Sequence, residues 1–230
     1  MGMAIEKIDV LVADDQDIFR NRLVRMLSAE KDIRIVGSVS TGREAVDLAI
    51  AVNPEIILMD VEMEDAKAGI NAAIKILSAN PEMKIIFLTV HEDEGTIIEV
   101  FDTGAVDYVV KTVDCNGVLD HVRKAHKDIV QMDAAIQKVL RSEYMRLSHS
   151  MQDNLAFIRC FARFTQAERE IVSFLLQGKK TLEIAKERYV EPVTIKKQIG
   201  QILKKSGCKR TKNLCQRIRD LQVTTLFDIE

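Results

Sequence analysis

The sequence predicts an α/β protein, with a doubly wound, five-stranded parallel sheet in its first part and helices in its second. Up to residue 128, short apolar runs alternate with amphipathic stretches, whereas from residue 129 onward the pattern is helical throughout. The net charge also changes sign between the two parts. At 230 residues the chain exceeds the usual length of one domain, and each part is long enough to bury its own core.

Five short apolar runs are predicted to form the strands of the sheet. They are residues 8–13, 33–37, 56–59, 84–88 and 107–110. Such nearly continuous apolar runs are typical of strands that are buried on both faces. The stretches between and after them have helical periodicity, at residues 16–28, 42–52, 68–79, 95–103 and 115–130. Five successive βα units predict a parallel sheet with helices on both faces.

Residues 129–163 are predicted to form a helical linker after the α/β domain of residues 6–128. Apolar side chains recur there mostly at spacings of three and four, and the segment contains no Gly or Pro. Two interpretations stay open for this apolar stripe. It either packs on the chain's own domains or forms the seam of a helical dimer.

Residues 164–222 are predicted to form a separate helical domain. A capping box, Thr165–Glu168, begins its first helix, and Gly178 follows the end of that helix. Further helices are expected at residues 181–188, 192–205 and 211–222. Two short helices joined by a tight turn, the second rich in lysine, are typical of a helix-turn-helix.

The charge distribution indicates different partners for the two parts. Residues 1–128 carry 14 basic and 24 acidic side chains, a net charge of −10, whereas residues 165–220 carry 14 and 6, a net charge of +8. A basic helical domain is typical of a domain that binds a polyanion, here double-stranded DNA. The alternative is a pair of solvated surfaces of opposite charge that attract each other.

Other features of the composition predict a cytoplasmic protein that has no contact with a membrane. The sequence has no run of about 18 apolar residues, and the segment that begins at Met1 lacks the pattern of a signal peptide. The four cysteines are not spaced as a C-x-x-C metal pair. We therefore expect them to be reduced thiols.

Five polar side chains stand at the predicted carboxyl ends of the strands, where doubly wound sheets bind ligands. Asp14 and Asp15 follow the first strand and Asp60 the third, whereas Thr89 and Lys111 follow the fourth and fifth. Taken singly, each has a common structural role, as a helix cap, a strand residue or a solvated charge. Their joint occurrence at successive strand ends indicates a shared site.

Three converging carboxylates repel one another unless a hard cation and a phosphoryl group share their site. Mg²⁺ takes oxygen ligands and usually combines one or two carboxylates with a phosphate oxygen. We therefore expect Asp60 to be the nucleophile that accepts a phosphoryl group and Asp14 and Asp15 to hold Mg²⁺. Lys111 and Thr89 would contact the oxygens of the acyl phosphate.

With these residues, segment 6–128 resembles the receiver domain of response regulators. The whole chain resembles the NarL/FixJ type of two-component response regulator, which has a LuxR-type DNA-binding domain. The resemblance implies a flavodoxin-like fold with strand order 2-1-3-4-5. It also implies that Asp60 is the phosphorylated residue, that Thr89 and Tyr108 are switch residues, and that the backbone carbonyl of Glu62 is a further metal ligand.

The second part resembles the LuxR-type domain in three stretches, Phe164–Glu170, Glu183–Ala185 and Thr194–Lys196. The resemblance implies that the helix from residue 192 enters the major groove of DNA, with Thr194, Lys196 and Lys197 as groove contacts. Phosphate contacts are expected from a larger set, namely Lys179, Lys180, Lys204, Lys205, Lys209 and Arg210. The alternative for these lysines is a solvated helix face.

The sequence departs from the family pattern at several positions. Glu64 and Asp65 follow Met63 where receivers commonly have Met-Pro, which adds acid near the expected metal. Glu191 replaces the usual serine cap of the recognition helix. Gly200 stands where relatives often present a side chain that contacts a base.

The function that this resemblance implies is a regulator, not an enzyme. A partner histidine kinase would phosphorylate Asp60 in the presence of Mg²⁺, and the phosphorylated chain would form a homodimer and bind a promoter. One alternative is a regulator of the same fold that works without phosphorylation. Another is a phosphatase of the haloacid dehalogenase type, but that family needs a second Asp two residues after the nucleophile, where this chain has Glu62.

Overall fold

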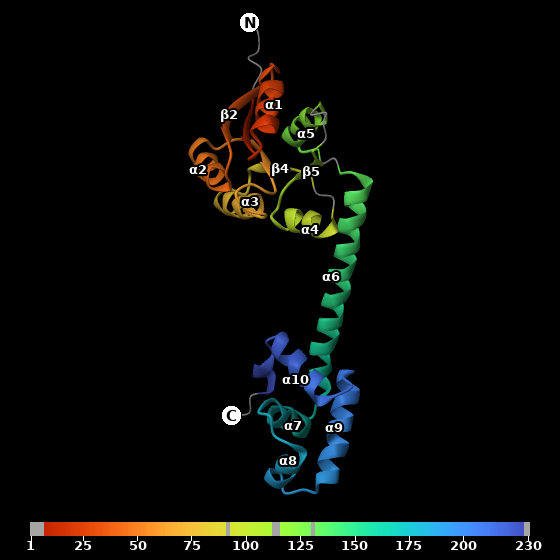
Figure 1. Cartoon of the computed structure of the whole chain (residues 1–230). Coiled ribbons are helices and arrows are strands. Elements are labelled where there is room, and N and C mark those ends of the chain that lie inside the picture. The colour runs from red at the N-terminus through yellow and green to blue at the C-terminus, as the bar shows by residue number, and fades with distance from the viewer. Residues whose placement is uncertain (1–6, 91–92, 112–115, 130–131, 228–230) are drawn as a thin grey trace. The chain divides into compact units, whose positions relative to one another are not determined.

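The computed structural model describes residues 7–90, 93–111, 116–129 and 132–227. The chain divides into two compact units, Met1–Tyr144 and Met145–Glu230. The first unit contains a sheet with helices around it, and the second unit is helical (Figure 1). Cys160, Cys208 and Cys215 are free thiols, and Cys115 lies outside the described residues.

The sheet of the first unit has five parallel strands in the order β2-β1-β3-β4-β5. The strands are β1 (Ile8–Ala13), β2 (Ile33–Val39), β3 (Ile56–Asp60), β4 (Lys84–Thr89) and β5 (Asp107–Val110). Every residue of the central strand β3 is buried, as its continuous apolar sequence predicted. The expected flavodoxin-like fold and strand order are therefore confirmed.

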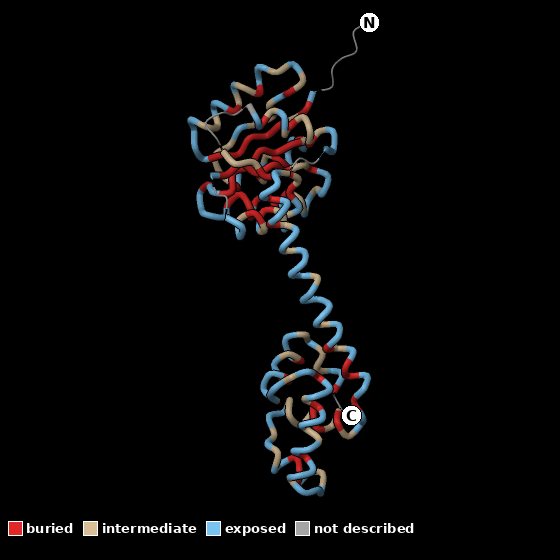
Figure 2. Tube along the Cα trace, turned by 90° about the vertical axis from the view of Figure 1, so that its right-hand side faces the viewer, coloured by how far each residue is buried: buried red, intermediate tan, exposed pale blue. Residues whose placement is uncertain are grey.

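Helices cover both faces of this sheet, as a doubly wound fold requires. They are α1 (Asp17–Ser28), α2 (Gly42–Val52), α3 (Ala68–Ala79), α4 (Glu94–Asp102) and α5 (Asn116–His126). Helices α1 and α5 pack with one face of the sheet, through residues such as Leu23 and Val122. Helices α2, α3 and α4 pack with the other face, through residues such as Ala49, Ile76 and Val100. Figure 2 shows the resulting buried core around the strands.

The helical second part contains the predicted helices and two short 3₁₀ helices that the sequence did not predict, η1 and η2. They are α6 (Ala134–Cys160), the 3₁₀ helix η1 (Phe161–Arg163), α7 (Gln166–Leu176), α8 (Thr181–Glu187), α9 (Pro192–Ser206), α10 (Thr211–Asp220) and η2 (Thr224–Phe227). The capping box of Thr165 and Glu168 is present at the start of α7. Gly207, with φ of 68°, ends α9 in the left-handed conformation that glycine favours.

Aromatic rings form the centre of the second core. The ring of Phe161 lies edge-on against the rings of Phe157, Phe164 and Phe227, with centroid separations of 4.9, 5.5 and 4.8 Å. Edge-to-face pairs of this kind add stability beyond the apolar area that they bury. Ile171, Ile195 and other apolar residues of α7–α10 complete this core.

Each end of α6 packs into the core of one unit. Ile136 and Val139 belong to the apolar cluster of the α/β unit, and Phe157 and Cys160 belong to that of the helical unit. Of the two interpretations of the linker stripe, packing on the chain's own domains therefore holds at these ends. The linker boundaries of 129–163 and a dimer seam stay predictions. Among the described residues, no helix is both long and apolar enough to cross a membrane.

Candidate functional site

Three aspartates meet at the carboxyl edge of the sheet. Asp14 directly follows β1, Asp15 comes next, and Asp60 is the last residue of the neighbouring strand β3. One carboxylate oxygen from each lies within 4.8 Å of the others. Asp14 and Asp60 are almost completely buried, at 1 % and 5 % exposure, and Asp15 is exposed. Parallel pairing brings these ends together because all the strands finish at the same edge.

Lys111, the residue after β5, places its ammonium group between the two buried carboxylates. Its Nζ lies 2.5 Å from Asp60 Oδ2 and 2.7 Å from Asp14 Oδ2. The aromatic ring of Phe19 also lies against the same ammonium, with 4.8 Å between Nζ and the ring centroid. The convergence of Lys111 with the aspartates that the sequence predicted is therefore present in the structure.

The environment of Asp60 works against its ionisation. Burial raises the pKa of Asp60 to about 6, and the nearby Asp14 carboxylate acts in the same direction. The Lys111 ammonium and the backbone N–H of Glu62 oppose this effect, since both stabilise the charged form. A metal cation bound at the cluster would act in the same direction as Lys111. It would lower the pKa of Asp60 and favour the charged carboxylate.

The donor atoms of this site fit Mg²⁺. The three carboxylates supply only oxygen, which is the ligand type that Mg²⁺ prefers. Asp14 Oδ2 is buried and, although it is paired in charge with Lys111, accepts no hydrogen bond of good geometry. A hollow of about 130 Å³ opens beside them, lined by Asp15, Gln16, Asp60, Glu62, Met63, Thr89, Val90 and Lys111. A hard cation and a phosphoryl group would satisfy the charge and the open oxygen.

The two predicted switch residues lie on neighbouring strands. Thr89 ends β4, is 1 % exposed, and lines the hollow next to Asp60. Tyr108 lies on β5 opposite Phe87 of β4, and its side chain is buried in the apolar cluster under α4. Their switch roles, and the metal-binding roles of the aspartates and the Glu62 carbonyl, stay predictions.

The acidic loop after β3 adds less charge to the site than its sequence suggested. The Glu64 carboxylate accepts hydrogen bonds from the backbone N–H groups of Gly42, at 2.7 Å, and Arg43, at 3.3 Å, in the first turn of α2. Asp65 Oδ1 accepts from the backbone N–H of Lys67, at 2.8 Å. The Glu64 carboxylate thus caps the start of α2, whereas the Asp65 carboxylate closes a tight turn just before α3. Of the acidic residues of this loop, only Glu62 lines the hollow.

Gly69 supports the site in a way that the sequence analysis missed. It lies in the first turn of α3, and its N–H donates to the carbonyl of Val61 at 3.1 Å. A Cβ atom at this position would lie 1.8 Å from the carbonyl oxygen of Asp60. Only glycine permits this approach. The single available signal was a glycine within a helical pattern shortly after Asp60.

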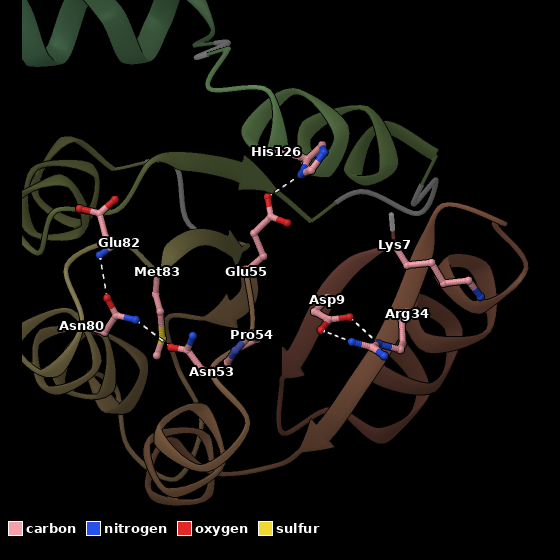
Figure 3. Close-up of a pocket in the computed structure, with 10 residues that line it drawn as sticks. All are labelled: Lys7, Asp9, Arg34, Asn53, Pro54, Glu55, Asn80, Glu82, Met83 and His126. Atoms are coloured by element: carbon pink, nitrogen blue, oxygen red, sulfur yellow. Dashed lines mark hydrogen bonds and ion pairs between the residues drawn. The ribbon is translucent and has the colours of Figure 1, made fainter. Parts of the chain in front are cut away.

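A larger hollow, of about 760 Å³, lies at the opposite edge of the sheet, where the strands begin (Figure 3). Part of its charged lining is paired within the chain. Arg34 binds Asp9 through two hydrogen bonds, and Nδ1 of His126 lies 2.5 Å from a carboxylate oxygen of Glu55. The candidate site is the smaller hollow at Asp60, where the predicted aspartates and Lys111 converge.

The predicted DNA-binding residues are exposed except for Lys179, which is half-buried, and two of them have partners within the chain. Lys179 pairs with Glu187 at 2.7 Å and lies over the ring of Phe174. Lys205 pairs with Glu168 at 2.7 Å. The remaining predicted residues are exposed on α9 or in neighbouring loops, namely Lys180, Thr194, Lys196, Lys197, Lys204, Lys209 and Arg210. Their contacts with DNA stay predictions.

Comparisons with known proteins agree with this fold. The family model of the response regulator receiver domain matches residues 10–123. The transcriptional regulatory protein LiaR of Bacillus subtilis is 34 % identical over 86 % of this chain and 90 % of its own length. The transcriptional regulatory protein DegU of Brevibacillus brevis is 26 % identical over 93 % of this chain and 94 % of its own length. The chain therefore belongs to the two-component response regulators of the NarL/FixJ type, with a receiver domain and a LuxR-type helix-turn-helix.

Solved structures show the same fold at lower sequence identity. A LuxR-family response regulator from Aurantimonas covers 61 % of this chain and 99 % of its own, with a TM-score of 0.55 and 21 % identity. The response regulator RcsB of Salmonella typhimurium covers 89 % of this chain and 94 % of its own, with a TM-score of 0.53 and 19 % identity. At these identities the likeness supports the fold alone.

Proposed function

We propose that a partner histidine kinase phosphorylates this chain on Asp60, with Mg²⁺ bound at Asp14, Asp15, Asp60 and the carbonyl of Glu62. The observation that carries the proposal is the position of the Lys111 ammonium between the buried carboxylates of Asp60 and Asp14. That arrangement concentrates negative charge at a strand end and supplies one cation from the chain. It leaves the remaining charge for Mg²⁺ to balance.

The proposed reaction forms one P–O bond and breaks one P–N bond. A carboxylate oxygen of Asp60 attacks the phosphorus of a phosphohistidine, and the histidine leaves with its bonding electron pair. Mg²⁺, when bound, neutralises charge on the transferring phosphoryl group. Lys111 then holds one phosphoryl oxygen by charge, and the Thr89 hydroxyl donates a hydrogen bond to another. The small volume of the hollow keeps the group close to these partners.

Phosphorylation would change the output of the chain by shifting its conformational population. Movement of Thr89 toward the phosphoryl group would draw Tyr108 with it and alter the surface formed by α4 and β5. That surface would then favour a homodimer. Two helix-turn-helix units would meet DNA half-sites about one helical turn apart and regulate transcription. Both the kinase and chromosomal DNA would meet the chain in the cytoplasm.

Phosphoryl transfer to Asp60 can be tested with a small phosphodonor. The full chain is incubated with acetyl phosphate and Mg²⁺, and intact mass spectrometry detects the added phosphoryl group. We expect labelling of the native chain and of Asp65→Asn, which changes an exposed carboxylate of the loop after β3, but not of Asp60→Asn. Labelling that persists in Asp60→Asn would contradict the assignment. A native chain that takes up no label from acetyl phosphate or a kinase would support the phosphorylation-independent alternative.

DNA binding by α9 can be tested through its dependence on charge. Binding to duplex DNA should weaken steeply as salt rises, because lysine contacts release counterions from phosphates. Lys196→Ala combined with Lys197→Ala should reduce affinity strongly. Lys67→Ala combined with Lys75→Ala serves as the matched control, since it removes two exposed lysines of the receiver. Affinity that is independent of salt, or equal losses in both variants, would argue against α9 as the recognition helix.

A further inference from the structure

The outward face of α9 has an unusual composition for a recognition helix. Ile195 and Ile202, both fully buried, mark the face that packs into the core. The opposite face is centred on one exposed row at spacings of four, three and four residues, made of Val193, Lys197, Gly200 and Lys204. We call these four residues the outer row of α9. The outer row itself contains no Arg, Asn or Gln, the side chains best suited to bidentate hydrogen bonds with base edges, and the exposed Gln201 lies beside it.

Val193 provides the apolar contact of the outer row. Its side chain is 74 % exposed in the first turn of α9, one turn before Lys197. A single exposed valine is common on protein surfaces. Here, however, it lies in line with two lysines on a domain of net positive charge. The basic surroundings favour a polyanion as the partner that covers it.

Gly200 has no explanation within the fold. It lies in the interior of α9 with an ordinary helical backbone, where glycine costs about 1 kcal/mol relative to alanine. A Cβ atom at this position would meet nothing within 4 Å, so the chain itself does not require glycine. Gly69, by contrast, is needed because the backbone of Asp60 lies against it. A glycine that only an outside partner can explain suits a close approach of backbone to ligand.

We propose that the outer row reads thymine-containing DNA by shape and apolar contact. This inference rests on the proposed DNA binding and names its specificity. Val193 packs on the 5-methyl group of a thymine in the major groove. Gly200 allows the helix backbone to lie against the base edges next to it, and Lys197 and Lys204 reach the polar atoms on either side. In this arrangement methyl contact supplies the discrimination that bidentate side chains supply elsewhere.

The test begins with selection of bound duplexes from a randomised pool by the full chain, with and without acetyl phosphate and Mg²⁺. Each thymine of the selected site is then replaced by uracil, which lacks only the 5-methyl group. At one thymine of each half-site we expect the replacement to weaken binding about fourfold, as the loss of one buried methyl group predicts. Val193→Ala should weaken binding to the thymine duplex by a similar factor and should no longer respond to uracil at that position.

Gly200→Ala tests the close approach separately from folding. Because alanine favours helix, we expect the thermal stability of the helical unit to rise while affinity for the selected site falls roughly tenfold. Gly117→Ala is the matched control. Gly117 is also an exposed helical glycine whose Cβ would meet nothing within 4 Å, but it lies in α5 of the receiver. This control should leave DNA affinity unchanged.

The outcomes separate this inference from the proposed function. Salt-dependent selection of a site, with no response to uracil at any thymine, would overturn the methyl contact while leaving DNA binding intact. Unchanged affinity in Gly200→Ala would overturn the close approach. If no duplex is selected or bound in either phosphorylation state, DNA binding itself fails, and the specificity proposal fails with it.

Discussion

Asp60 and Asp14 are buried side by side at the carboxyl edge of the sheet, and the Lys111 ammonium lies between them. A buried charge is costly unless a partner compensates it, so the three side chains depend on one another. The same residues that form the proposed phosphorylation site therefore also limit the stability of the receiver when no metal is bound. Two predictions at the residue scale follow from this coupling.

Removal of Lys111 should destabilise the receiver in the absence of metal. Lys111→Ala leaves two buried carboxylates without their cation, and breaking such a pair typically costs roughly 3–5 kcal/mol. Mg²⁺ should restore part of this loss by replacing the missing positive charge. Urea denaturation with EDTA and with excess Mg²⁺ measures both effects. Lys67→Ala is the control, because its pair with Glu99 is about half exposed and should change stability by less than about 1 kcal/mol.

Asp60→Asn should stabilise the metal-free receiver, and the gain should depend on pH. The folded-state pKa of Asp60, about 6, lies above the ordinary value of 3.8, so folding favours the protonated carboxyl. The free energy of unfolding of the native chain therefore falls as pH rises between about 4 and 6. That of Asp60→Asn does not change for this reason, because asparagine has no proton to lose. The advantage of Asp60→Asn should grow over this range to about 1–3 kcal/mol and stay constant above it. Urea unfolding in EDTA at several pH values tests this, and an advantage that shrinks as pH rises would contradict it.

At the scale of elements, the site depends on how closely α3 approaches the end of β3. The first turn of α3 passes so near to Asp60 that a side chain at Gly69 would overlap the Asp60 carbonyl. This contact positions the loop that carries Glu62 and Glu64 between the two elements. The Glu64 carboxylate then joins the loop to the first turn of α2.

Gly69→Ala should therefore displace α3 or the end of β3 and damage both stability and phosphorylation. Overpacking of this kind commonly costs about 1–3 kcal/mol, and the extreme overlap here predicts the upper part of that range. Thermal unfolding and acetyl phosphate labelling of the same variant would measure the two effects. Gly117→Ala, where the added methyl group meets nothing, should fold and label like the native chain.

Helix α5 is attached to β5 by a contact that depends on pH. Nδ1 of His121 lies 2.5 Å from the buried carboxylate of Asp107, and this hydrogen bond raises the pKa of His121 above its ordinary 6.5. The charged imidazole therefore stabilises the fold below about pH 6.5, and this contribution is lost as pH rises through the higher folded-state pKa. His121→Gln should be destabilising at pH 5.5 and less so at pH 9. Equal losses at both pH values in urea unfolding would exclude the ionic contribution.

At the scale of the whole molecule, the two units have separate apolar cores, which in the receiver unit lie on both faces of the sheet. Phe87 lies in the core of the receiver unit, and Phe161 lies at the centre of the aromatic core of the helical unit. Each core contains the elements of one unit and is large enough for cooperative unfolding. Mg²⁺ and DNA should therefore each stabilise directly only the unit to which they bind.

Calorimetry of the full chain should separate the two units. Phe161→Ala should lower the stability of the helical unit by roughly 3–5 kcal/mol, the usual cost of removing a buried aromatic ring. It should leave the transition of the receiver unchanged. Mg²⁺ should raise the transition of the receiver alone, since the aspartates that fit it lie there. The same scan is repeated with Asp60→Asn, which removes one of the proposed metal ligands. A rise in the transition of the helical unit on addition of Mg²⁺ to this variant would contradict the division.

Local patterns in the sequence determined the elements and most of the receiver site. Apolar runs located the five strands, and because parallel strands end at one edge, Asp14, Asp60 and Lys111 had to converge. The capping box at Thr165 and the glycine after Ser206 likewise located helix ends, since these signals act over only a few residues. The sharp difference in charge indicated a separate basic domain.

Tertiary structure alone decided where individual side chains point and which close approaches exist. Glu64 was predicted to add charge beside the metal, but it caps α2, 22 residues earlier in the sequence. Lys205 pairs with Glu168, 37 residues earlier in the chain, a contact that the sequence did not predict, and its contact with a DNA phosphate stays a prediction. The requirement for glycine at position 69 depends on the backbone of a neighbouring strand. Contacts between residues far apart in the chain leave no periodic pattern, because they arise only when the folded backbone brings them together.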